Sequence, residues 1–151
     1  MKESYLKCEE CAGNVIDKEA GILNRGNLTR LKNFLNRAAQ GERLTVGFIG
    51  GSITQGFAAT DADKCYAART VGWLRKIFPN TEFDYVNAGI GATNSQFGAA
   101  RVQEDLLRRL PDLVMVEFSV NDHSTPHDME TYEGLVRQIY DSSSCPAMVL
   151  L

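Results

Sequence analysis

The stretch that decides the fold of this chain is Leu44-Thr45-Val46-Gly47-Phe48-Ile49-Gly50-Gly51-Ser52-Ile53-Thr54. Residues 44–49 are mostly apolar and predict a buried strand, which ends where the small residues begin. A strand that ends in glycines can leave the next side chain exposed at the carboxyl edge of a sheet. Open α/β proteins gather their chemistry at that edge. Ser52 is therefore the leading candidate for a functional residue.

Outward from this strand, apolar segments alternate with segments of helical periodicity. The further strands are predicted at 83–87, 113–118 and 146–151, and the helices at 28–38, 66–78, 95–110 and from 128 onward. Asn27 and Asp128 are the expected helix caps, and Gly41 and Pro79 the expected stops. Strict alternation with nearly continuous apolar strands predicts an α/β fold with a parallel sheet covered on both faces. We expect an extension over residues 1–26 and one domain over residues 27–151.

Composition and charge exclude several classes of protein. Of the 151 residues 44% are hydrophobic, and the net charge of −3 comes from acidic and basic residues mixed along the sequence. Without a basic stripe or a long apolar run, neither nucleic acid nor a membrane is an expected partner. Residues 1–8 lack the apolar core of a signal peptide, so the cytoplasm is the default location, with export of a longer precursor left open.

The four cysteines do not form a framework. Cys8 and Cys11 make a C-x-x-C pair, but no second pair follows, so a structural zinc or redox role is not favoured. Asp61 and Asp63 suit a solvated loop better than a cation site, and Trp73 suits helix packing. No metal or organic cofactor is expected.

Each complete strand is followed by residues suited to catalysis. These segments are Gly-Gly-Ser-Ile-Thr at 50–54, Asn-Ala-Gly-Ile-Gly-Ala-Thr-Asn-Ser at 87–95 and Ser-Val-Asn-Asp at 119–122. The carboxyl ends of parallel strands meet at one edge, so the three segments should share a cleft. Acyl transfer needs a hydroxyl to attack the carbonyl and fixed donors for the oxyanion, and these segments supply both.

From about Leu44 onward the sequence resembles the SGNH hydrolases, also called the Gly-Asp-Ser-Leu esterase and lipase family. The resemblance implies a flavodoxin-like fold and a serine esterase or acylhydrolase acting on a small ester, which an acetylated carbohydrate would supply. It implies that Ser52 is the nucleophile and also an oxyanion donor through its amide. The second donor would be the amide of Gly91, or of Ala92 if the loop aligns without a gap. The third would be the side chain of Asn121.

The sequence departs from the family pattern in three places. Gly51 stands where the family usually has Asp, and Ser119 where it usually has Gly. The Asp-x-x-His motif that supplies the catalytic base is absent, because no Asp here has His three residues later. His123 and His127, the only histidines, are expected to be solvated loop residues.

A covering helix is expected after an apolar strand, and the sequence reaches position 151 within the last predicted strand. We therefore expect the front part of a longer protein, nearly inactive by itself, with self-association through the exposed sheet edge left open. Two other functions remain. One is a nucleotide or phosphate binder, although Phe57 and Ala58 stand where a P-loop has Lys and Ser or Thr. The other is a module that binds acylated ligands without turnover.

Overall fold

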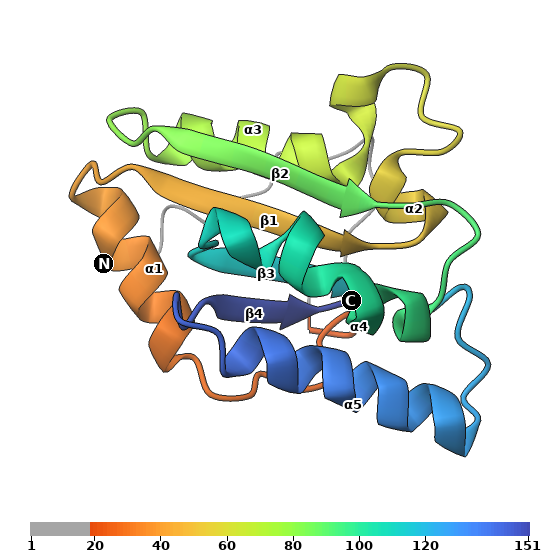
Figure 1. Cartoon of the computed structure of the whole chain (residues 1–151). Helices are drawn as coiled ribbons and strands as arrows, with labels where there is room; N and C mark the ends of the chain where they lie inside the picture. Colours follow the sequence, from red (N-terminus) through yellow and green to blue (C-terminus); the bar gives the residue numbers. More distant parts are fainter. Residues whose placement is uncertain (1–18) are drawn as a thin grey trace.

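The protein was studied as a computed structural model that describes residues 19–151. Cys8 and Cys11 lie outside this range. Four parallel strands form one sheet in the order β2-β1-β3-β4, which is a flavodoxin-like order. They are β1 (Leu44–Gly50), β2 (Phe83–Gly89), β3 (Leu113–Glu117) and β4 (Ala147–Leu150). In Figure 1 the arrowheads lie at one side of the molecule, which is the carboxyl edge of the sheet.

Four long helices cover the two faces of the sheet. They are α1 (Thr29–Ala39), α3 (Tyr66–Ile77), α4 (Ser95–Asp105) and α5 (Pro126–Tyr140). One core joins α1 and α3 to side chains of β1 such as Val46 and Phe48. The other joins α4 and α5 to the opposite face, around Val114 and Val116. The predicted parallel sheet with helices on both faces is therefore confirmed.

The short elements lie in the connections. A single turn, α2 (Ser52–Gln55), follows β1, and two 3₁₀ turns, η2 (Ala62–Lys64) and η3 (Leu107–Arg109), precede α3 and β3. No helix in the range 19–151 has the length and apolar character that crossing a membrane requires.

Three predicted helix ends were wrong. The cap of α1 is Leu28, although the Asn27 side chain still accepts the Thr29 N–H at 2.9 Å. The cap of α5 is Thr125, whose hydroxyl accepts the Asp128 N–H in a capping box, so Asp128 is the third residue of the helix rather than its cap. The helix predicted over 95–110 ends at Asp105, because the chain changes to the 3₁₀ turn η3 before Leu110.

Gly89 at the end of β2 allows the sheet to approach the turn α2. A Cβ there would lie 2.6 Å from the Thr54 carbonyl carbon and still closer to the Gln55 nitrogen. Because both atoms are backbone, we expect Gly89→Ala to lower the free energy of unfolding by about 2 kcal/mol, measured in urea.

Gly72 on α3 is the matched control, since a Cβ there meets nothing within 4 Å. Gly72→Ala should raise stability by up to about 1 kcal/mol, because alanine favours a helix. Equal effects of the two substitutions would contradict the close approach at Gly89.

Candidate active site

Ser52 is the first residue of α2, directly after the carboxyl end of β1. The turn is fixed at both ends: the Gly51 N–H donates to the Glu117 carbonyl at 3.2 Å, and Gly56 ends it in the left-handed region at φ 98°. No other residue described here accepts the Ser52 N–H, which lies at the free amino end of the turn. A hydroxyl and a free N–H therefore come together at one residue.

A buried polar network supports α2 from below. Thr54 is fully buried, and its hydroxyl bonds to the Tyr66 hydroxyl at 2.9 Å. The Asn87 side chain donates to the Thr54 carbonyl at 2.8 Å and to the Tyr85 hydroxyl at 3.0 Å. Burial raises the pKa of Tyr66 and raises the pKa of Tyr85 to about 12, so both phenols stay neutral at physiological pH. The network therefore holds α2 through neutral hydrogen-bonding groups.

The second segment turns back beside α2. The Ile90 N–H donates to the Gly50 carbonyl at 3.1 Å, and the Gly91 N–H donates to Gln55 Oε1 at 2.8 Å. Ala92 is left-handed at φ 57°, and its N–H has no partner within residues 19–151. A Cβ at Gly91 would lie 3.7 Å from Ser52 Cβ, so this loop borders the serine.

The third segment reaches the second through Asn121. Its Nδ2 donates to the Thr93 carbonyl at 2.7 Å, which leaves one amide hydrogen of that group. The strand β3 ends in the buried Glu117, whose Oε1 accepts the Ser119 hydroxyl at 2.8 Å and the Ser119 N–H at 3.1 Å. Ser119, which stands where the family usually has glycine, thus stabilises the turn after β3 through its two bonds to the Glu117 carboxylate.

The departure at Gly51 also has a physical reason. A Cβ there would lie 3.2 Å from Asn121 Nδ2 and 3.3 Å from the Thr93 carbonyl oxygen. Any larger residue would press on the contact that joins the second and third segments. The glycine therefore lets that contact form close to Ser52.

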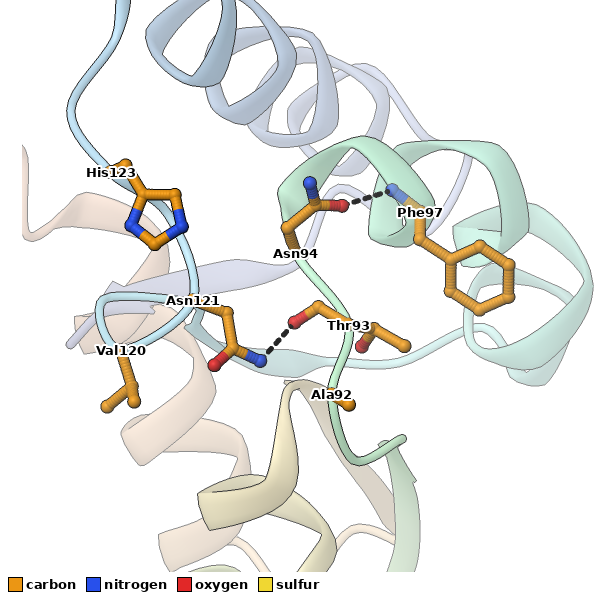
Figure 2. A pocket seen from close by; sticks show the side chains of 7 residues that line it. All are labelled: Ala92, Thr93, Asn94, Phe97, Val120, Asn121 and His123. Atoms are coloured by element: carbon orange, nitrogen blue, oxygen red, sulfur yellow. Dashed lines mark hydrogen bonds between the residues drawn. The ribbon is translucent and has the colours of Figure 1, made fainter.

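Two hollows meet at Asn121 and Val120. A narrow crevice contains Ser52, and beside it lies a hollow of about 540 Å³. In Figure 2 Asn94 lies between His123 on one side and Phe97 on the other. The hollow is lined by Ala92, Thr93, Asn94, Phe97, Val120, Asn121 and His123.

Phe97 was missed by the sequence reasoning, which used helical spacing only to find buried residues. Phe97 is 49% exposed, and the centre of its ring lies 5.6 Å from the guanidinium carbon of Arg101. Arg101 is buried, with Nη2 donating to the Gly50 carbonyl at 3.3 Å and Nη1 paired with Asp105 at 2.9 Å. A buried cation therefore backs the ring and links it to the end of β1.

The other polar residues of the second and third segments hold helices and loops in place. Asn94 caps α4 by accepting the Phe97 N–H at 3.2 Å, and Asp122 accepts the Ser95 N–H at 2.9 Å. His123 lies in the loop after β3 and lines the hollow. The prediction of a loop was wrong for His127, which lies in the first turn of α5.

No metal cluster occurs among the side chains of residues 19–151. Asp61 pairs with Lys64 at 2.5 Å on the surface. Trp73 is 49% exposed on α3. The loop after β1 presents Phe57, 78% exposed, at the position where a P-loop would present its lysine.

Ala92 occupies a backbone region that favours glycine. Because left-handed φ costs a residue with a Cβ roughly 1 kcal/mol, Ala92→Gly should raise the free energy of unfolding by about that amount. Urea unfolding measures it. Ala100→Gly, at an exposed position of α4, is the control and should lower the free energy of unfolding by a similar amount. If Ala92→Gly also lowered the free energy of unfolding, the backbone at Ala92 would not be strained.

The fold and the site define a class: α/β proteins with a serine at the carboxyl edge of a parallel sheet, facing amide donors from two neighbouring strands. Residues 48–150 match the GDSL-like Lipase/Acylhydrolase family. The chain belongs to that family, whose members are the SGNH hydrolases.

Known relatives agree with this assignment. A two-domain esterase (CEX) active on acetylated mannans, co-crystallized with mannopentaose, is 54% identical, with a TM-score of 0.89 over 91% of this chain and 38% of that one. The acetylxylan esterase of Geobacillus stearothermophilus is 31% identical over 62% of this chain and 45% of its own length. The SGNH-hydrolase family esterase AlinE4, 20% identical with a TM-score of 0.57, shares the fold over 72% of this chain and 58% of its own. The chain spans less than half the length of the first two.

Proposed function

We propose that this chain carries the nucleophile and the oxyanion-binding groups of a serine esterase that removes acetyl groups from carbohydrates. One observation carries the proposal. The bond of 2.7 Å from Asn121 Nδ2 to the Thr93 carbonyl brings the third segment against the second, beside Ser52. A hydroxyl, free backbone N–H groups and a side-chain amide then face one place, which is the arrangement that acyl transfer requires.

The proposed reaction begins with attack of Ser52 Oγ on the ester carbonyl. The oxygen becomes negative as the bond forms, and the N–H of Ser52 and the Asn121 amide stabilise it together with an N–H of the loop at 90–93. Collapse releases the alcohol and leaves an acetyl group on Ser52, which water then removes as acetate. The Ser52 proton needs an acceptor, and the proposal requires a histidine from sequence outside these 151 residues.

The substrate class is inferred from the relatives and from the hollow beside Ser52. The mannan esterase and the acetylxylan esterase both act on acetylated carbohydrates, as their names state. The hollow combines the Phe97 ring with polar groups of Asn94 and His123. An aromatic face with a few polar groups suits a sugar ring, whose C–H faces are apolar and whose edge carries hydroxyls. We therefore place the sugar alcohol in this hollow.

Acetate release tests the function. The product of the whole reading frame is incubated with acetylated manno- and xylo-oligosaccharides, and the rate of acetate release is measured. The rate of benzoate release from the same oligosaccharides carrying benzoyl esters is the comparison. Rapid release of acetate without release of benzoate supports the proposal. A well-folded product that releases neither acid would refute it.

Phe97→Ala should affect sugar binding without affecting the chemistry. We expect KM for acetylated manno-oligosaccharides to rise about fivefold, as loss of one stacking contact of about 1 kcal/mol implies. The kcat for p-nitrophenyl acetate, which carries no sugar, should be unchanged. Steady-state kinetics on both esters measures the difference.

Trp73→Ala is the matched control, because Trp73 has the same 49% exposure as Phe97 but lies on α3, across the sheet. It should leave both constants unchanged. If Phe97→Ala lowers activity equally on both esters, Phe97 supports the fold of the site and does not contact the sugar.

A further inference from the structure

The side chain of Gln55 joins the nucleophile turn to the second loop. Gln55 is the last residue of α2, three positions after Ser52, and its Oε1 accepts the Gly91 N–H at 2.8 Å. A Cβ at Gly91 would lie only 2.8 Å from the same oxygen, so a larger residue there would push the Gln55 carboxamide out of its present place. The Gly91 N–H is therefore already bonded within the protein.

The neighbouring N–H is placed differently. Ala92 is exposed and left-handed at φ 57°, and among residues 19–151 its N–H has no acceptor. The turn around it is held by three bonds: Gln55 to Gly91, Asn121 to the Thr93 carbonyl, and the Thr93 hydroxyl to the Ile90 carbonyl at 2.7 Å. The free N–H of Ala92 is thus held in place from both sides, between the anchored Gly91 and the anchored Thr93.

We propose that Gln55 is a positioning residue that holds the Gly91 N–H and thereby presents the Ala92 N–H to the oxyanion. This inference rests on the proposed esterase function. Ser52 and Gln55 share one helical turn, so the attacking oxygen and the donor loop keep a fixed relation through a single side chain. A Gly91 N–H that acted on substrate would first have to break its bond to Gln55.

Amide hydrogen exchange tests the contact in the 151-residue chain without requiring activity. In Gln55→Met, which keeps the length of the side chain but lacks the acceptor, exchange at Gly91 should become about tenfold faster or more. Gln55→Glu retains an accepting oxygen and should keep Gly91 protected. Exchange at Ala92 should be fast in every form.

Gln138→Met is the matched control. Gln138 also bonds a backbone group through its side-chain amide, since its Nε2 donates to the Ala99 carbonyl at 3.1 Å, but it lies on α5. Its substitution should leave Gly91 exchange unchanged. Equal Gly91 exchange in the original chain and in Gln55→Met would overturn the proposal.

Kinetics of the whole reading-frame product test the consequence. Gln55→Met should lower kcat for p-nitrophenyl acetate about 10- to 100-fold with KM unchanged, because a displaced donor weakens binding of the transition state only. An unchanged or raised kcat would overturn the proposal. It would mean that the Gly91 N–H binds the oxyanion itself once its bond to Gln55 is lost. Absence of activity before any substitution would instead refute the esterase function, and the exchange experiment would still decide the contact.

Discussion

Ser52→Ala is expected to lower the rate of acetyl ester hydrolysis by about 10⁴-fold or more, because no other group can form the acyl-enzyme. Ser52 lies at the start of α2, in the crevice that also contains Asn121. Removal of its hydroxyl leaves the N–H and the rest of the turn in place, so the fold should persist. The measurement is kcat/KM for p-nitrophenyl acetate, made on the whole reading-frame product.

Ser143→Ala is the control for this experiment. Ser143 is an exposed serine between α5 and β4, at the amino edge of the sheet, and its loss should not change the rate. Substantial hydrolysis by Ser52→Ala would mean that another nucleophile acts. Trapping of an acetyl group on Ser52, seen as a mass increase of its peptide, would identify the intermediate directly.

The 151-residue chain gives a second comparison. It contains no Asp-x-x-His motif, so its Ser52 lacks the family's base and should hydrolyse esters far more slowly than a product that contains one. Ser52-dependent hydrolysis by the short chain would show that a base lies within it. His123 would then be the candidate, because it lines the hollow next to Asn121.

The sheet and the position of Ser52 and Asn121 at its carboxyl edge could be predicted, because both depend on local pattern. Continuous apolar runs mark strands that are buried on both faces, and glycine, asparagine and serine after each run mark its carboxyl end. Ser52 and Asn121 were found in this way. Helix ends were harder, since Asn27 and Asp128 both make capping bonds and only the geometry tells which residue is the cap.

The contacts between the segments could not be predicted. Gln55 and Gly91 are 36 positions apart, and no periodicity links a side-chain carbonyl to a particular amide. A left-handed residue is usually sought at glycine, but here Gly91 gives space to Gln55 while Ala92 takes the positive φ. The sequence left the choice between Gly91 and Ala92 open, because it depends on whether the loop aligns with the family pattern without a gap. Phe97 was missed because an exposed aromatic residue in a helix has no pattern of its own.

Asn121→Ala is expected to lower kcat about 100- to 1000-fold, the usual effect of removing one oxyanion donor, with a much smaller change in KM. The side chain has two tasks, since one amide hydrogen bonds the Thr93 carbonyl and the other is free to face the oxyanion. Steady-state kinetics of the whole reading-frame product measures the loss. Asn36→Ala, at an exposed position of α1, is the control and should have no effect.

Asn121→Asp keeps the shape of the side chain but removes both of its hydrogen-bond donations, to the Thr93 carbonyl and to the oxyanion. The carboxylate has the size of the amide but donates nothing to Thr93, and its negative charge would face an oxygen that also becomes negative. We therefore expect a larger loss of kcat than with alanine. An aspartate variant more active than the alanine variant would show that Asn121 acts by filling space, and the oxyanion would then have to be stabilised by the backbone N–H groups of Ser52 and the neighbouring loop alone.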